Sequence, residues 1–335
     1  MDFTPAEQQI LALLDFLEKR QRPRDLHAIQ DSSEAYFGMY RLDWTGAMEK
    51  LIGRGYLHLE EGQLHLTDAG RPLAARLRLQ HPKHRYFYDE FFSRAASSRA
   101  HAELCEQVYG KNLCQHGLMD MTQLERMLQI LDLGKRSCLL ELGCGNGMIA
   151  EYIAATTGAQ VTGLDISGVG IQQALERTKD RSSQLAFIQT DMLCLDFPPN
   201  RFDSVIAIDS LYFVSDLLAL LDRLDAIVLP GGQLGVFWSS WQGDDDPASL
   251  LQASETPFAQ ALKKRGLPYQ AWDLTVQEIE HWTRKLQVVN RLKAAFEAEG
   301  NQFLFNNRFL EANTHQRFVS AGRVSRYFYR VQLGR

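Results

Sequence analysis

An apolar segment that runs directly into three glycines constrains this chain more than any other feature. Residues 139–147 read Leu-Leu-Glu-Leu-Gly-Cys-Gly-Asn-Gly, and a helical pattern begins at Met148. Glycine has no Cβ and tolerates positive φ, so a turn of this kind lets a ligand touch the backbone at a helix N-terminus. A nicotinamide site requires its third glycine at position 148, which weakens the dinucleotide interpretation. We therefore expect a ligand site of another kind.

Short β-rich segments alternate with helical segments after this point. The predicted strands are 138–142, 161–164, 185–189, 204–208 and 233–238. This alternation is typical of an α/β protein with a doubly wound, Rossmann-like, mainly parallel sheet. Thr275 to Glu299 reads as one long helix that starts with a capping box of Thr275 and Glu278, and residues 326–333 read as a final aromatic strand.

Polar side chains follow the predicted strands. Asp165 ends the second strand, 18 residues after Gly147, where a carboxylate can accept both hydroxyl hydrogens of a ribose. After the third strand, Asp191 is placed to take an adenine amino group and Met192 to lie on the purine. The alternative is structural: Glu141 and Asp165 would accept helix amides, and Asp191 and Met192 would only shape the turn.

Together with the segments 201–204 and 229–232, these features resemble the class I S-adenosylmethionine-dependent methyltransferases over about residues 105–240. The resemblance implies a seven-stranded sheet and S-adenosylmethionine as cofactor, with S-adenosylhomocysteine as product. The five cysteines include no C-x-x-C pair, so we expect no zinc or other metal site. Cys144 is expected to be a small turn residue and not a nucleophile. The cofactor contacts that the resemblance implies in this core are Glu141, Gly143, Cys144, Gly145, Gly147, Asp165, Ile166, Asp191, Met192 and Asp209.

Residues 108–117, Val-Tyr-Gly-Lys-Asn-Leu-Cys-Gln-His-Gly, resemble the segment that folds over the cofactor in phosphoethanolamine and sterol methyltransferases. By that resemblance Tyr109, Gln115 and His116 cover the methionyl end of the cofactor, and Tyr86 and Tyr88 help to close the lid. These residues belong to a helical lid predicted at 83–130. A cap is predicted at about 241–313.

The candidate proton acceptors are Tyr212 and His116. Phosphoethanolamine-type relatives carry a histidine where this chain has Phe213, so their acid–base device is in doubt here. Such residues more often have structural roles, the tyrosine in packing and the histidine in capping, than a role in proton transfer. A sulfonium methyl is already activated, and transfer depends mainly on orientation and exclusion of water. A dedicated base is therefore not required.

The N-terminal 82 residues read as a separate domain. Thr4 and Glu7 form a capping box, three helical segments follow, and residues 56–66 alternate as in a hairpin. With the segment 51–71, this order resembles a winged helix, which either dimerises or binds DNA. Residues 1–82 carry ten Lys or Arg and twelve Asp or Glu, so we expect dimerisation. The methyltransferase domain is predicted at 83–335.

Composition and missing motifs narrow the remaining choices. The N-terminus lacks a secretory pattern and no apolar run is long enough for a bilayer span, so we expect a cytoplasmic protein. A net charge of −5 and the absence of Asp-Pro-Pro-Tyr and Pro-Cys motifs make nucleic acid an unfavourable partner. We expect a small-molecule acceptor at nitrogen, oxygen or carbon. The alternatives are a DNA-binding regulator that senses a ligand and a methyltransferase of macromolecules.

Overall fold

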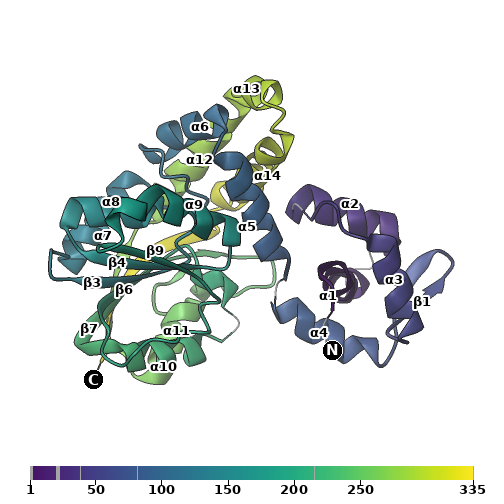
Figure 1. Cartoon of the computed structure of the whole chain (residues 1–335), viewed down its shortest axis with the longest axis horizontal. Coiled ribbons are helices and arrows are strands. Elements are labelled where there is room, and N and C mark those ends of the chain that lie inside the picture. Colours follow the sequence, from purple (N-terminus) through teal and green to yellow (C-terminus); the bar gives the residue numbers. More distant parts are fainter. Residues whose placement is uncertain (1–2, 20–22, 38, 81, 215, 335) are drawn as a thin grey trace. The chain divides into compact units, whose positions relative to one another are not determined.

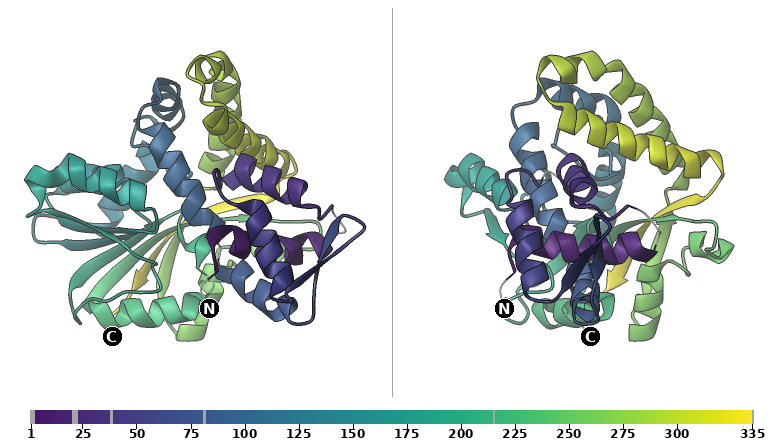
Figure 2. Two further views of the ribbon diagram at one scale, coloured as in Figure 1. Left: turned by 45° about the vertical axis from the view of Figure 1, so that its right-hand side comes forward. Right: turned by 90° about the vertical axis from the view of Figure 1, so that its right-hand side faces the viewer.

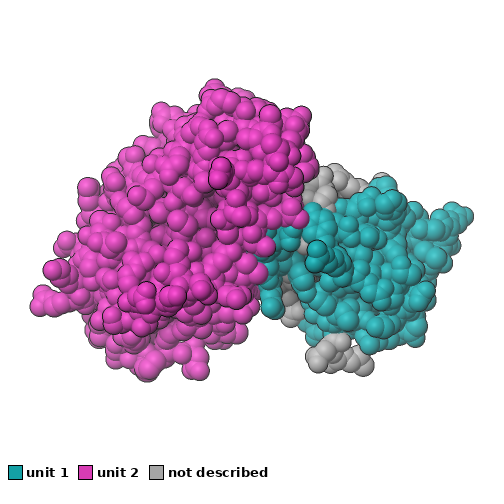
Figure 3. All heavy atoms as spheres, turned by 45° about the horizontal axis from the view of Figure 1, so that its top comes forward, with its two compact units in different colours: residues 1–91 teal, residues 92–335 magenta. Residues whose placement is uncertain are grey.

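The computed structural model describes residues 3–19, 23–37, 39–80, 82–214 and 216–334. The chain divides into two compact units, residues 1–91 and 92–335, which are shown in different colours in Figure 3. Helix α5 (Pro82–Ala95) runs across the division.

Unit 1 contains helices and one hairpin. The Thr4 amide donates to the Glu7 carboxylate at 2.8 Å and the Glu7 amide donates to Thr4 Oγ1 at 3.3 Å, which confirms the predicted capping box. The core gathers around Ile10, Trp44 and Leu64. The predicted helices and hairpin are all present, and a further helix, α4, follows them. The elements are α1 (Pro5–Lys19), α2 (Leu26–Phe37), α3 (Trp44–Gly53), β1 (Leu57–Glu60), β2 (Gln63–Leu66) and α4 (Gly70–Gln80).

Unit 2 is built on a sheet that has seven strands in the described residues, in the order β5-β4-β3-β6-β7-β9-β8. Neighbours from β5 to β7 are parallel, whereas β9 is antiparallel to both β7 and β8. This confirms the predicted doubly wound, mainly parallel sheet. The strands are β3 (Cys138–Leu142), β4 (Gln160–Asp165), β5 (Leu185–Gln189), β6 (Phe202–Ile208), β7 (Val228–Trp241), β8 (Tyr269–Asp273) and β9 (Val324–Gln332).

Helices cover both faces of this sheet (Figure 1). Apolar residues of α7, α8 and α9 pack on one face, and those of α10 and α11 pack on the other. The helices are α6 (Arg99–Tyr109), α7 (Met121–Leu131), α8 (Met148–Thr157), α9 (Gly168–Thr178), α10 (Leu217–Ile227), α11 (Pro257–Arg265), α12 (Thr275–Arg291), α13 (Lys293–Ala298) and α14 (Gln302–Ser320). Short 3-10 turns are η1 (Lys179–Arg181), η2 (Leu211–Phe213) and η3 (Ala248–Leu251).

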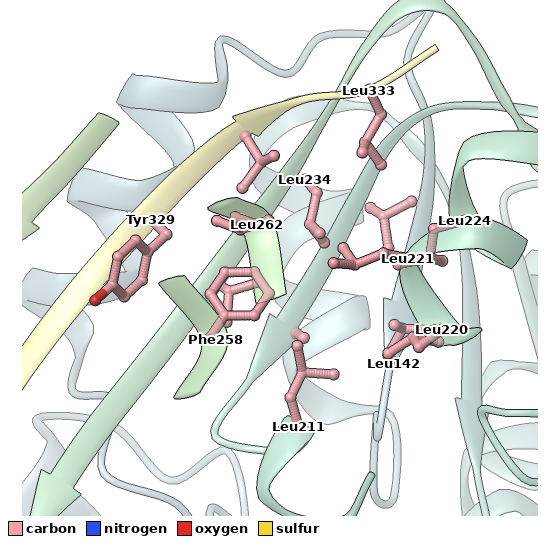
Figure 4. Packing of buried hydrophobic residues seen from close by; sticks show 14 of the residues in the cluster. Leu142, Leu211, Leu220, Leu221, Leu224, Leu234, Phe258, Leu262, Tyr329 and Leu333 are labelled. Atoms are coloured by element: carbon pink, nitrogen blue, oxygen red, sulfur yellow. The ribbon is translucent and has the colours of Figure 1, made fainter. Parts of the chain in front are cut away.

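The face covered by α10 and α11 shows how the sheet is filled. Figure 4 shows Leu142 and Leu234 from the strands facing Leu221 of α10 and Phe258 of α11. Leu142 and Leu234 come from strands buried on both faces, which explains why the strands read as nearly continuous apolar runs in the sequence. Helices α6, α12, α13 and α14 form a separate group beside the sheet (Figures 1 and 2).

Two predictions about the C-terminal part are wrong. The single helix expected from Thr275 to Glu299 is two helices, α12 and α13, which meet at Leu292. The expected capping box of Thr275 and Glu278 does not form, because Asp273 Oδ1 accepts the Thr275 amide at 2.8 Å and Glu278 is turned into the core. The region before α12 contains the edge strand β8, which lies at one end of the sheet.

In the part of the chain that the structure describes, no helix combines the length and apolar character needed to cross a membrane.

Candidate active site

The glycine turn lies at the carboxyl edge of the parallel strands, between β3 and α8. The amides of Gly143 and Cys144 both donate to the carbonyl of Leu164, at 2.8 and 2.9 Å, so the turn is tied to the end of β4. Gly147 has a φ of +79°, and a Cβ there would lie 2.6 Å from the Phe187 ring. The turn therefore needs glycine at this position both for its backbone angle and for space.

Asp165 is fixed beside this turn by two backbone amides. Its Oδ2 accepts the Gly145 amide at 2.7 Å and its Oδ1 accepts the Ser167 amide at 2.8 Å. A carboxylate offers about four lone-pair sites, so bonds from backbone amides do not by themselves prevent it from binding hydroxyl groups. Ile166 follows with 37% of its surface exposed. The structural and the ligand-binding interpretations of Asp165 are therefore compatible.

Glu141 is the unusual carboxyl group of the site. Only 1% of its surface is exposed, and its Oε2 has no hydrogen-bond partner within the described residues. Burial, and after it the negative charge of Asp165, raises the pKa of Glu141 to about 8. A cationic group of a ligand would satisfy this oxygen and favour the ionised form. A cofactor with an ammonium group fits this feature.

Met192 and Asp191 lie on the next part of the edge. A Cβ on Gly143 would lie 3.9 Å from the terminal methyl of Met192 and 2.6 Å from Cβ of Ser210, so the turn, Met192 and the end of β6 meet. Asp191 is exposed, and its Oδ1 accepts the Leu193 amide at 2.8 Å. The structure thus brings Met192 to the glycine turn, whereas Asp191 shapes its own loop.

Asp209 follows β6 and has protein partners on both oxygens. Arg326 donates to Oδ1 at 2.7 Å and to Oδ2 at 3.1 Å. The amides of Leu118 and Met119 also donate to Oδ2, at 2.7 and 3.2 Å. Asp209 has a φ of +52°, which is uncommon for a residue with a side chain. It anchors the segment before α7 to the edge of the sheet.

The predicted lid residues near α6 hold their own segment together. The Tyr109 hydroxyl donates to the Gly117 carbonyl at 3.0 Å. Gln115 accepts the Leu113 amide at 2.9 Å and donates to the Lys111 carbonyl at 3.2 Å. These contacts fold residues 109–119 into a compact connection that Asp209 then ties to β6. Tyr86 and Tyr88 lie in unit 1, and their prediction as lid residues stays a prediction.

The two predicted proton acceptors have different environments. The Tyr212 hydroxyl accepts the Ser239 amide at 2.6 Å, and burial followed by the charge of Asp209 raises the pKa of Tyr212 above its usual range. Burial, and after it the charge of Arg308, lowers the pKa of His116 to about 3. Tyr212 is therefore a neutral phenol and His116 a neutral imidazole at physiological pH. Neither titrates near neutrality, where a general base is most effective.

Several polar residues near this edge were not predicted. Arg326 of β9 is completely buried: besides Asp209, it donates to Gln123 Oε1 and Ser239 Oγ, both at 2.9 Å. Glu278 accepts hydrogen bonds from Ser239 Oγ and from the indoles of Trp241 and Trp282. Because Arg326 is far in sequence from Asp209, Gln123 and Ser239, no local sequence pattern identifies it as part of this network.

One signal for these residues was present in the sequence. Glu278, His281, Trp282 and Lys285 are spaced as i, i+3, i+4 and i+7, which places them on one face of α12. This face is buried, although an inward stripe is normally apolar. A polar stripe of this kind indicates a site or a buried network.

Phe92 of α5 covers the glycine turn from outside the sheet. A Cβ added to Gly145 would lie 2.6 Å from Cζ of Phe92, and the Phe92 carbonyl accepts the side-chain amide of Gln173 at 3.0 Å. The space beside Gly145 is therefore occupied in part by protein.

Among the described residues, no group of three or more His, Cys, Asp or Glu side chains could hold a metal ion.

The sequence of this chain is similar to those of known methyltransferases. Residues 139–232 match the methyltransferase domain family. The chain is 29% identical to the methyltransferase phqN of Penicillium fellutanum over 154 residues, which cover 42% of this chain and 47% of that protein. It is 32% identical to the 27-O-demethylrifamycin SV methyltransferase of Amycolatopsis mediterranei over 149 residues, which cover 41% and 54%. The chain thus spans about half the length of these relatives.

Solved structures share the fold. Phosphoethanolamine N-methyltransferase 2 of Haemonchus contortus has a TM-score of 0.60 and 19% identity, with coverage of 74% of this chain and 60% of that one. The cyclase SpnF has a TM-score of 0.53 and 20% identity, with coverage of 64% and 80%. Residues 139–232 thus match the methyltransferase domain family, and the sheet of unit 2 has the class I methyltransferase fold.

Proposed function

We propose that this protein is an S-adenosylmethionine-dependent methyltransferase that acts on a small molecule. The observation that carries the proposal is the pair of carboxyl groups at the glycine turn of the methyltransferase domain. Asp165 is fixed beside the turn by the amides of Gly145 and Ser167, and Glu141 is buried with one oxygen that has no partner in the described residues. The pair fits a cofactor that carries both a ribose and an ammonium group.

Different residues hold different parts of the cofactor. Asp165 accepts the ribose hydroxyls, Glu141 faces the ammonium group, and Met192 lies beside the purine. The segment 109–119 covers the methionyl end and excludes water, held by the hydrogen bonds of Tyr109 and Asp209. When bound, the cofactor supplies an activated methyl group on a positively charged sulfur. The protein's own task is to orient the acceptor and keep the site dry.

The names of the relatives support a small acceptor. They include a rifamycin methyltransferase and sterol 24-C-methyltransferases, the latter 35% identical over 101 residues, so both O- and C-directed enzymes are similar to this chain. The motifs of amino-directed and cytosine-C5 DNA methyltransferases are missing from the sequence. We infer that the acceptor is a metabolite and not a nucleic acid.

For unit 1 we propose dimerisation. Its third helix, α3, carries Lys50 beside Glu49, and Arg54 at its end lies 3.7 Å from Glu7 and over the ring of Phe3. Two acidic residues thus accompany these two cations, which does not favour a DNA surface. Light scattering of the full chain tests this: a dimer supports the proposal, and a monomer that shifts DNA in a gel contradicts it.

The enzyme proposal requires two measurements. The first is calorimetric titration of the full chain with S-adenosylmethionine and S-adenosylhomocysteine, with NAD as the control ligand. The second is incubation with S-adenosylmethionine labelled in its methyl group and a small-molecule cell extract. Because a cyclase shares this fold, binding alone does not establish methyl transfer. Micromolar binding with a labelled product supports the enzyme, binding without product favours a ligand sensor, and absence of binding overturns the cofactor site.

A further inference from the structure

The ring of Phe92, near the end of α5, packs against two glycines of unit 2. A Cβ on Gly145 would lie 2.6 Å from Cζ of this ring, and a Cβ on Gly170 would lie 3.1 Å from its Cδ2. The same Cβ on Gly170 would lie 2.7 Å from the Gly145 carbonyl oxygen, so the glycine turn meets the first turn of α9 at this point. Phe92 itself is 4% exposed. The ring therefore fills the space that the two missing side chains leave.

This space adjoins the proposed cofactor site. The Gly145 amide donates to Oδ2 of Asp165, the carboxylate that is proposed to accept the ribose hydroxyls, at 2.7 Å. Gly145 and Asp165 are both half-buried, so solvent reaches this part of the turn. A ligand that touches the backbone of Gly145 uses the volume that the absent Cβ leaves open. Passage to the turn from this side requires the Phe92 ring to move.

One side chain of α9 fastens α5 at Phe92. Gln173 Nε2 donates to the Phe92 carbonyl at 3.0 Å. The other side-chain atom of this amide, Oε1, is buried and has no hydrogen-bond partner among the described residues. A buried acceptor without a partner costs free energy, which water repays when the group becomes exposed. The closed position of α5 therefore carries a cost that opening removes.

The chain after α5 has the features of a hinge. Ala96 and Ser97 form an exposed turn, and both are small. On the other side of this turn, Ser98 Oγ donates to Glu299 Oε2 at 2.6 Å, and the Ala100 amide donates to Glu299 Oε1 at 2.9 Å. The start of α6 is thus fixed to the end of α13. Hinges are commonly a few positions at the end of an element, so α5 can pivot at residues 96–97 without disturbing α6.

We propose that Phe92 is a gate of the cofactor site. The ring moves aside to admit S-adenosylmethionine, closes beside the bound cofactor, and moves aside again to release S-adenosylhomocysteine. The pivot is the turn 96–97. This inference rests on the proposed methyltransferase function. Movement of the gate sets the rate of cofactor exchange, whereas the equilibrium affinity depends on the carboxyl groups of Asp165 and Glu141. While closed, the ring keeps water from the turn, which favours methyl transfer.

The test compares Phe92→Ala with the wild type and with Phe309→Ala. The control removes the same side chain from α14, where Phe309 stacks on Phe305. Surface plasmon resonance of the immobilised full chain gives the association and dissociation rate constants of S-adenosylhomocysteine. We expect Phe92→Ala to raise both rate constants at least about tenfold and to change the dissociation constant by less than about threefold, because a gate acts on passage in both directions. Phe309→Ala should keep both wild-type rate constants.

Other roles of Phe92 give different results. If the ring is a fixed wall that contacts the cofactor, Phe92→Ala raises only the dissociation rate constant and weakens binding, which overturns the gate. Unchanged rate constants overturn it as well. Should Phe92→Ala fail to fold, Gln173→Ala decides, because release of the Phe92 carbonyl should raise both rate constants and unchanged values overturn the gate.

The wild type separates this inference from the proposed function. A wild type that does not bind S-adenosylhomocysteine overturns both. A wild type that binds it, with Phe92→Ala unchanged in both rate constants, overturns the gate alone.

Discussion

Arg326 and Asp209 form a two-point ion pair in which the guanidinium is completely buried and the carboxylate is 3% exposed. The two residues lie 117 positions apart, on β9 and at the end of β6. The same carboxylate accepts the amides of Leu118 and Met119. Arg326 of β9 therefore holds the carboxylate of Asp209. That carboxylate in turn anchors residues 118 and 119 of the segment proposed to cover the cofactor.

Asp209→Asn should destabilise the protein strongly, because it leaves the buried guanidinium of Arg326 without its counter-charge. Removal of one partner of a buried ion pair costs about 3 to 5 kcal/mol. Asp222→Asn is the matched control, since Asp222 pairs with Arg265 at an exposed position, where such a pair contributes about 0 to 1 kcal/mol. Urea unfolding followed by tryptophan fluorescence gives both values. Equal losses in the two variants would show that the buried pair is not a main anchor.

Asp165→Ala should weaken cofactor binding, and the loss of binding free energy should exceed the contribution of two ribose hydrogen bonds. Each bond to a charged group contributes about 1.5 to 3 kcal/mol, and the variant also releases the amides of Gly145 and Ser167. Calorimetry with S-adenosylhomocysteine measures the change, with Asp180→Ala on the exposed turn η1 as control. An unchanged dissociation constant for Asp165→Ala would remove this residue from the site.

Binding of S-adenosylhomocysteine should release a proton from Glu141. With its pKa raised to about 8, this carboxyl group is mostly protonated at pH 7, and a nearby ammonium group lowers the pKa and favours ionisation. Affinity should therefore increase as the pH rises from 6 to 8. Calorimetry at pH 7 in buffers of different ionisation enthalpy should detect release of close to one proton per molecule. Glu141→Gln should abolish the release, and a wild type without buffer dependence would refute the assignment.

Gly145→Ala should couple to Phe92. The new Cβ would lie 2.6 Å from the Phe92 ring at a residue with a φ of +57°. We expect a loss of about 1 to 3 kcal/mol in the free energy of unfolding, part of it from the strained backbone angle. In a Phe92→Ala background the steric part should disappear and leave about 1 kcal/mol. A double-mutant cycle measures this coupling, and strictly additive losses would contradict the contact.

Local sequence patterns predicted the sheet and the glycine turn after β3 because both depend on short segments. Strand β3 ends where the apolar run meets the glycines, and Asp165 has the expected place at the end of β4. The capping box of Thr4 and Glu7 forms, whereas the same pattern at Thr275 and Glu278 does not. Glu278 instead meets groups from β7 and α12 that satisfy it better than a helix terminus, and this competition is invisible in a local motif.

The polar centre of unit 2 could not be predicted for a similar reason. Arg326 is one basic residue in an aromatic strand, and only the antiparallel insertion of β9 between β7 and β8 brings it to Asp209. The stripe of α12 was recognisable from its spacing, but the sequence does not show that Glu278 and Lys285 have side-chain partners whereas the His281 ring has no hydrogen-bond partner among the described residues. Such distinctions depend on residues that the fold brings together from distant segments.

The place of β9 in the sheet also has a consequence for synthesis on the ribosome. Strands β3 to β7 emerge first, yet Asp209 acquires its counter-charge only after Arg326 has left the exit tunnel. At about 5 to 20 residues per second, roughly 6 to 23 s separate the two residues during translation. In that interval the edge beside β7 lacks β9, and an unpaired strand edge of this kind is a template for pairing with other strands.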